Sequence, residues 1–120
     1  MTDHQDFALS QDLKNLAAEM RDNSERWFPE IHFVDAKLPL SAFYAMGLAG
    51  EAGETLDAIK KFYRAGGDHM VKTHYQHISA AKQELSDVFT YLLLLADEMS
   101  VDLVSEYRAK VLINEERFGR

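Results

Sequence analysis

The sequence predicts an all-α protein built as a four-helix-type bundle. Three observations lead to this prediction: apolar residues recur at helical spacing in four segments, strand signals are weak, and the chain holds only two prolines, Pro29 and Pro39. A chain of 120 residues has the usual length of one domain, so residues 1–120 are expected to form a single domain.

The first half of the chain is expected to hold two helices. One is expected in the N-terminal segment 1–25 and runs roughly from Ser10, a plausible N-cap for the regular apolar spacing that follows it, to Arg26. The other covers residues 39–65. It begins at a proline, which is favoured in the first turn of a helix, and it ends at Gly66 and Gly67. The two prolines bound a loop between these helices.

The second half of the chain is expected to hold two more helices. Residues 67–77 show no clear period, so we expect a loop there. A third helix is expected over residues 78–99, and a fourth over residues 102–118 with Asp102 as its N-cap. Four helices joined in this way pack as antiparallel neighbours in a bundle.

Composition and charge narrow the classes of function. The net charge of −7 argues against a nucleic-acid surface or an anionic-membrane surface, because both need clustered Lys and Arg. The chain has no cysteine, which removes disulfides and thiolate sites. Its polar N-terminus does not resemble a signal peptide, and its longest apolar run is far too short to span a membrane. We therefore expect a cytoplasmic protein.

The second expected helix carries two glutamates, Glu51 and Glu54, three residues apart among three glycines. On a helical wheel they lie roughly opposite an apolar stripe that we predict to be the core face of this helix, formed by Ala45, Leu48, Ala52, Leu56, Ile59 and Tyr63. Each glycine inside a helix costs about 1 kcal/mol relative to alanine. We therefore expect the glycines to thin the helix, so that another helix or subunit can approach the carboxylates.

The third expected helix carries a second acidic pair, Glu84 and Asp87, at the same spacing. An acidic pair on a helix is usually a solvated face, but this pair leads directly into the apolar segment 88–96, which predicts a buried helix. Four carboxylates that face one another would repel and would raise one another's pKa values. A divalent cation resolves that conflict, and Mg²⁺ and Mn²⁺ prefer carboxylate oxygens.

The two acidic pairs and their surroundings resemble the signature of the all-α nucleoside triphosphate pyrophosphohydrolases, the MazG-like superfamily. The segment GLAGEAGETLDAIK resembles the first motif of that family, and KQELSDVFTYLLLLADEMSVDL resembles the second. Residues 110–118 resemble the family's C-terminal motif. The similarity covers roughly residues 25–118, although the loop at residues 66–77 makes the spacing between the two acidic motifs long for the family.

The resemblance implies hydrolysis of a nucleoside triphosphate to a monophosphate and pyrophosphate, as in clearing non-standard or surplus nucleotides. Mg²⁺, with Mn²⁺ as a substitute, would be the cofactor, bound by Glu51, Glu54, Glu84 and Asp87. A glutamate of the first pair would orient or deprotonate the attacking water. The family also implies a homodimer or homotetramer, in which oligomerisation completes a bundle with the metal site between the second and third helices.

Substrate contacts are expected from side chains that suit phosphate, ribose or base. Lys110, Asn114 and Arg117 share one stripe of the last helix and match the family's C-terminal motif. The alternative interpretation is a solvated helix end, where cations complement the helix dipole. Three further candidates each have a structural alternative, as ion-pair partner, core side chain or loop anchor: Lys61, Tyr91 and Trp27.

Two alternative functions stay open. The enzyme would be specific for the pyrimidine nucleotides dCTP or dUTP if its similarity to the dCTP pyrophosphatase branch extends to the substrate. In a different class, the chain would be a non-catalytic helical interaction module whose acidic pairs form a solvated or subunit-pairing face. Zinc at His69, His74 and His77 is disfavoured because their spacing matches no strong motif.

Overall fold

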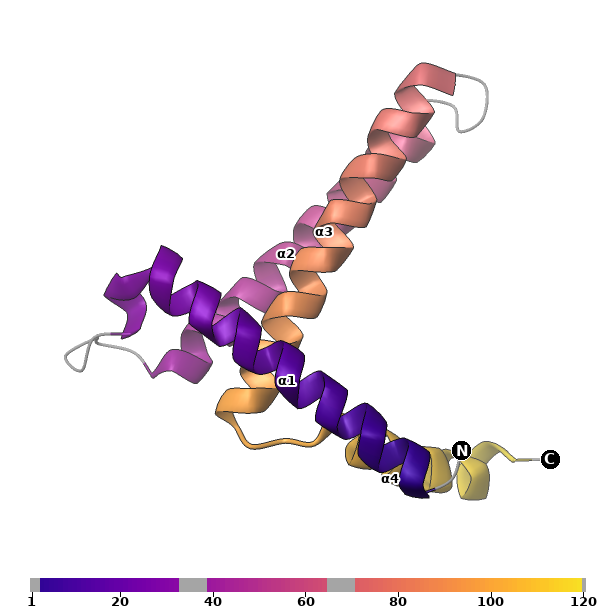
Figure 1. Ribbon diagram of the computed structural model, residues 1–120. Coiled ribbons are helices and arrows are strands. Elements are labelled where there is room, and N and C mark those ends of the chain that lie inside the picture. Colours follow the sequence, from indigo (N-terminus) through magenta and orange to yellow (C-terminus); the bar gives the residue numbers. More distant parts are fainter. Residues whose placement is uncertain (1–2, 33–38, 65–70, 120) are drawn as a thin grey trace. The chain divides into compact units, whose positions relative to one another are not determined.

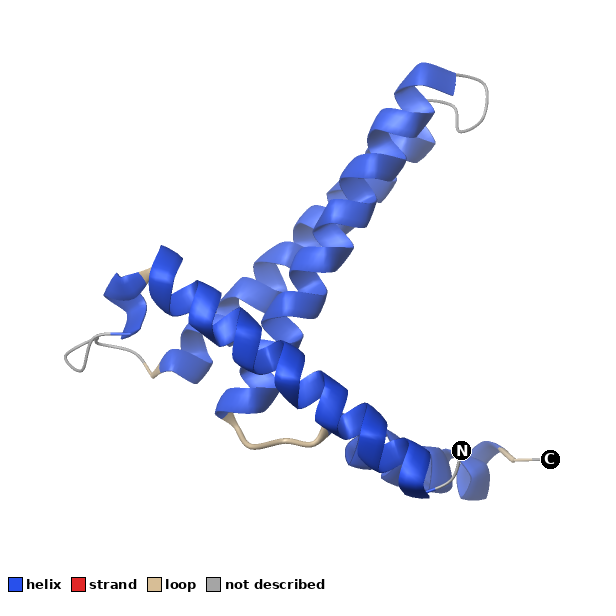
Figure 2. Cartoon of the chain, in the orientation of Figure 1, coloured by secondary structure: helices blue, strands red, loops and turns tan. Residues whose placement is uncertain are grey.

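A computed structural model describes residues 3–32, 39–64 and 71–119. In these residues the chain forms four α-helices and one short 3₁₀ helix, and no strand occurs (Figures 1 and 2). Their bounds are α1 Asp3–Trp27, η1 Pro29–His32, α2 Leu40–Arg64, α3 Val71–Glu98 and α4 Leu103–Phe118. The prediction of an all-α fold is confirmed. None of the described helices combines the length and the hydrophobicity that a bilayer-spanning segment needs.

Two helices begin earlier than the sequence predicts. Helix α1 starts at Asp3, so Ser10 lies inside the helix, where it is buried, and the prediction that it is an N-cap is wrong. Helix α3 starts at Val71, so the prediction of a loop is wrong for residues 71–77. Both extensions are polar and lack an apolar period, and a helix that is already nucleated propagates through such segments. The remainder of the expected loop, including Gly66, Gly67 and His69, lies outside the described residues.

The helices fall into two compact units, which are described separately. The first unit combines Met1–Ala36 with Leu93–Arg120, and the second is Lys37–Leu92. Helix α3 contributes its last residues to the first unit and the rest of its length to the second. The acidic pairs of both motifs belong to the second unit.

Polar contacts between α1 and α4 hold the first unit together. Ser10 Oγ donates to Asp102 Oδ1 over 3.0 Å, and Arg108 Nε donates to Asp6 Oδ2 over 3.1 Å. Asp102 also caps α4 as predicted, because the same Oδ1 accepts from the backbone N–H groups of Val104 and Ser105. These hydrogen bonds lower the pKa of the Asp102 carboxyl, since they favour its ionised form.

The turn from α3 to α4 is closed by a Schellman motif. Ser100 has a φ of 56°, in the left-handed region that ends many helices. The Val101 N–H donates to the Ala96 carbonyl over 2.8 Å, and the Ser100 N–H donates to the Asp97 carbonyl over 3.1 Å. The carbonyls of Ala96 and Asp97 in the last turn of α3 are therefore satisfied, and the chain turns directly into the cap at Asp102.

The second unit is an antiparallel pair formed by α2 and the first part of α3 (Figure 1). Helix α2 packs on α3 through the stripe that contains Tyr44, Thr55 and Ala58, all of them buried. The predicted core stripe of α2 is wrong, because Leu56, Ile59 and Tyr63 are 54%, 40% and 72% exposed. That stripe lies about a quarter turn around the helix from the packed one. Periodicity identified an apolar face without revealing which neighbour covers it.

Replacing Asp102 with alanine should destabilise the first unit by about 1 kcal/mol or more, because α4 loses its N-cap and buried Ser10 loses its acceptor. Asp102→Asn keeps an acceptor oxygen and is the matched control. Chemical denaturation followed by circular dichroism measures both variants. Equal stability of Asp102→Ala and wild type would show that this carboxylate does not connect α1 to α4.

Candidate metal centre

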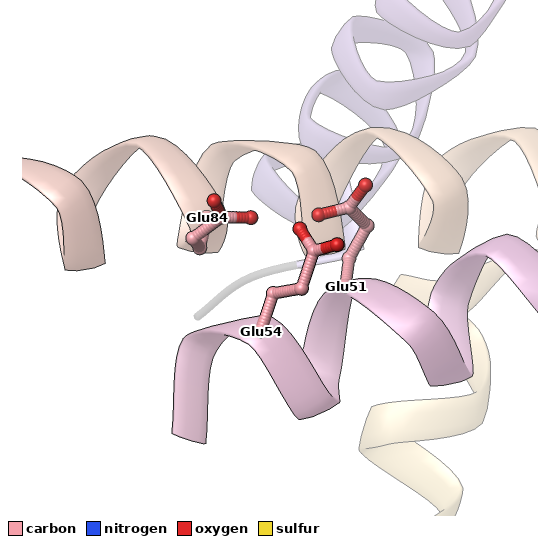
Figure 3. A group of neighbouring side chains, drawn as sticks. All are labelled: Glu51, Glu54 and Glu84. Atoms are coloured by element: carbon pink, nitrogen blue, oxygen red, sulfur yellow. The ribbon is translucent and has the colours of Figure 1, made fainter. Parts of the chain in front are cut away.

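Three glutamates converge between α2 and α3 in the second unit. Glu51 and Glu54 lie three residues apart on α2, and therefore on neighbouring positions of one helix face, while Glu84 extends from α3 toward them (Figure 3). One carboxylate oxygen from each lies within 4.8 Å of the other two. It is the only such group of potential metal-ligating side chains among the residues that the structure describes.

Two of these carboxylates are only partly accessible to water. Glu51 and Glu84 are half-buried, and the Oε2 atom of each is buried without a hydrogen-bond partner. Glu54 is exposed. A buried anionic oxygen without a donor is costly, so the pair of Glu51 and Glu84 needs either a proton or a cation.

Burial and neighbouring acids weaken the acidity of Glu51. Desolvation raises its pKa most, the adjacent Glu84 carboxyl raises it further, and the charges of Glu54 and Asp87 add to the effect. Together they raise the pKa of Glu51 to about 7, from an ordinary value of 4.5. A bound cation would counteract this rise in the pKa of Glu51, because its positive charge favours the ionised carboxylate.

Asp87, the fourth predicted ligand, is outside the group of three. It is exposed on α3, one turn beyond the last of the glutamates, and it contributes no oxygen to the cluster. Its charge nevertheless raises the pKa values of Glu51 and Tyr91, so it lies near the site. Its role as a ligand stays a prediction.

Of the three glycines near the acidic pair, only Gly47 has a side chain from another helix in the space that a Cβ would occupy. A Cβ at Gly47 would overlap the Tyr91 ring of α3, with Cδ1 and Cζ each 2.6 Å away. Gly50 and Gly53 have no such neighbour within 4 Å. The expectation that glycine allows another helix to approach therefore holds for Gly47, one turn before Glu51.

Tyr44, which was not among the residues predicted from the sequence, is the most buried large side chain of the described residues at 2% exposure. Its ring is tilted against that of Tyr91, with centroids 6.5 Å apart. The signal was present, because Tyr44 precedes Glu51 by seven residues and therefore shares its helix face. It packs against Tyr91, one turn of α2 before Gly47.

The predicted substrate contacts are distributed over both units. In the second unit, Lys61 pairs with Asp57 over 2.9 Å, and both side chains are largely exposed. In the first unit, the guanidinium of Arg117 lies over the ring of Phe118, 4.9 Å from its centroid. Three further candidates are exposed in the first unit, namely Trp27 on α1, and Lys110 and Asn114 on α4, whereas Tyr91 is half-buried on α3 in the second unit. Roles in substrate binding stay predictions for all of them.

The histidines named in the sequence form no described zinc site. His77 is half-buried on α3 and belongs to no metal-ligating group among the described residues. His69 and the side chain of His74 lie outside what the structure describes.

The raised pKa of Glu51 predicts an unusual pH dependence in metal-free protein. Between pH 4.5 and about 7 the folded state holds a proton on Glu51 that the unfolded state has released. This stabilising contribution is complete below pH 4.5 and is lost as the pH rises through 7. Glu51→Gln cannot lose this proton. In thermal unfolding with EDTA, its melting temperature should therefore rise relative to that of wild type as the pH increases from roughly 5 to 8.

Glu19→Gln, at an exposed position of α1, is the control and should follow the wild-type profile. If Glu51→Gln also follows the wild-type profile, the carboxylates are too well solvated to influence one another.

The chain was compared with protein-family models, with curated proteins and with solved structures, and none of these comparisons finds a match. The resemblance to the MazG-like superfamily therefore stays a prediction from the motifs. What supports a function for this chain is the set of converging carboxylates in the second unit, together with the sequence around them.

Proposed function

We propose that the chain is a Mg²⁺-dependent nucleoside triphosphate pyrophosphohydrolase, a MazG-like enzyme that converts a (d)NTP to a (d)NMP and pyrophosphate. The observation that supports it most is the pair of buried, partnerless Oε2 atoms of Glu51 and Glu84 beside Glu54. Packing brings together anionic oxygens that no protein donor neutralises. Such an arrangement is costly for a structural surface and useful for a cation site.

The donor set fits Mg²⁺ or Mn²⁺. All three converging groups are carboxylates, the hard oxygen ligands that these ions prefer over nitrogen or sulfur. Mg²⁺ commonly takes one or two protein carboxylates and completes its shell with water and substrate phosphates. Glu51 and Glu84 would hold the ion from opposite helices, and Asp87 would contribute through its charge or through a water molecule.

The bound ion would neutralise the triphosphate and lower the pKa of the attacking water. The chain's own contribution is proton handling and orientation. Glu54 is the exposed member of the cluster and is open to a water molecule, so it is the carboxylate best placed to take the proton, with Glu51 beside it on the same helix face. Water bonds to one phosphorus atom of the α–β anhydride and gives its proton to a carboxylate, while the bridging P–O bond breaks and pyrophosphate is released.

The substrate would be recognised by cationic and aromatic side chains. Lys110, Asn114 and Arg117 form an exposed stripe on α4 that suits phosphate or ribose oxygens. Lys61 would reach phosphate only by leaving Asp57, and Trp27 offers an exposed ring to a base. The narrower alternative, a pyrimidine-specific dCTP or dUTP pyrophosphatase, rests on the resemblance of the second motif.

A second copy of the chain would complete the bundle. Antiparallel packing places the exposed apolar residues of α2 and α3 on one side of the pair, namely Leu56, Ile59 and Tyr63 with Leu85, Phe89 and Leu92. A contiguous apolar face of this size marks an interaction site. The same face would serve a homodimer, a homotetramer or, in the competing view, a non-catalytic interaction module with a different partner.

Pyrophosphate release separates the enzyme from the interaction module. Purified protein should release pyrophosphate from a panel of canonical and modified (d)NTPs with Mg²⁺ or Mn²⁺, and not with EDTA. Glu54→Gln should lower the rate by about 100-fold or more through loss of a proton acceptor and ligand. Glu98→Gln, exposed at the end of α3, is the matched control and should retain activity. No release from any nucleotide, with a folded protein, would contradict the proposal.

The oligomeric state is tested by sedimentation velocity. Wild type should sediment as a dimer or tetramer of the 13.7 kDa chain. Leu56→Glu should shift it toward the monomer, because a charge would enter the apolar face, whereas Lys60→Glu on the exposed back of α2 should not. A wild-type monomer would show that this apolar face is not covered by a second copy.

A further inference from the structure

The ring of Tyr91 rests directly on the backbone of α2. The ring fills the space that a Cβ at residue 47 would need. Its Cδ1 and Cζ atoms each lie 2.6 Å from the position of such a Cβ. Tyr44, which lies on α2 like Gly47, packs against the same ring. The centroids of the Tyr44 and Tyr91 rings are 6.5 Å apart, and the angle between the ring planes is 52°. Since Tyr44 is 2% exposed, its own position is fixed by packing. The ring of Tyr91 is therefore held between Gly47 and Tyr44.

This contact lies beside the carboxylate cluster on both helices. Gly47 precedes Glu51 by one turn, and Tyr91 follows Glu84 by two turns. One turn advances an α-helix by only about 5.4 Å, so the separation set at the ring is passed on to the glutamates with little room for bending. The pKa of Tyr91 is raised by burial and by the charges of Glu51 and Asp87, which agrees with this proximity.

We propose that Tyr91 is a positioning residue: its ring, seated on Gly47, sets the separation of α2 and α3 at which the oxygens of Glu51, Glu54 and Glu84 converge on one cation. This inference rests on the metal site of the proposed function. It assigns Tyr91 a structural contribution to metal binding in place of the substrate contact that the sequence predicted, and it makes the ring the important part of the side chain.

The geometry gives the reason for this role. Packed helices lie about 8–10 Å apart, and side chains at the contact decide where in that range a pair falls. A glycine under an aromatic ring selects one value, because the ring can neither sink further nor move away without losing the support of Tyr44. Ligand oxygens must be held to about 0.5 Å for a productive site, so even a small change of separation would disturb the cluster.

Mn²⁺ binding to the full-length, nucleotide-free protein tests the inference, with free Mn²⁺ measured by electron paramagnetic resonance. Gly47→Ala forces a methyl group into the ring and should weaken Mn²⁺ binding by about tenfold or more. The matched control is Gly50→Ala, where nothing lies within 4 Å, and it should bind as wild type does. Tyr91→Phe keeps the ring and should also bind as wild type, whereas Tyr91→Leu should lose affinity as Gly47→Ala does.

The outcomes separate the two proposals. If wild type binds no Mn²⁺, the metal site itself is wrong. If wild type and Gly47→Ala bind equally, the metal site holds and the spacer role of Tyr91 is wrong. If Gly47→Ala does not fold, the two substitutions at Tyr91 decide. Equal Mn²⁺ affinities for Tyr91→Phe and Tyr91→Leu, whether both match wild type or both are weaker, would overturn the role of the ring.

Discussion

The mutual repulsion of carboxylates held between two packed helices is the constraint on which the second unit depends. Tyr44, Thr55 and Ala58 bring α2 against α3, and the same packing forces Glu51 and Glu84 together with buried oxygens that have no donor. Burial and like charge raise the pKa of Glu51 to about 7. The apolar contacts therefore sustain an arrangement that charge alone would separate, and a bound cation would turn the unfavourable contact into a favourable one.

The two sides of the α2–α3 pair differ in chemistry. The carboxylates lie at the interface between the helices and extend to one side, while Leu56, Phe89 and their exposed apolar neighbours lie on the other. Two packed helices bury little apolar surface, so further burial would add to the contacts that oppose the repulsion between the carboxylates. Covering the apolar side with a second copy would supply that stabilisation and leave the carboxylate side open, so the proposed oligomerisation and the proposed catalysis would use different surfaces of the same two helices.

Local structure could be predicted from the sequence where a single residue determines it, but not where a residue distant in the sequence does. Asp102 was recognisable as an N-cap, and the three-residue spacing of Glu51 and Glu54 predicted that they share one helix face, because capping and helical periodicity are local rules. Ser10 looked like another cap but lies mid-helix, bonded to a residue far along the chain. Leu56 looked like core because periodicity finds an apolar face but not its cover. The ring over Gly47 depends on tertiary packing and has no local signal.

The bonds that α1 makes to α4 and its N-cap join segments that lie far apart in the sequence. Ser10 and Asp102 are 92 residues apart, and Asp6 and Arg108 are 102 apart. During synthesis on the ribosome, the second unit, which is continuous in sequence, can form while α1 still waits for its partner. Closing so long a loop is slow. Helix α1 would thus reach its final packing only after α4 has been synthesised, so its contacts would be among the last to form.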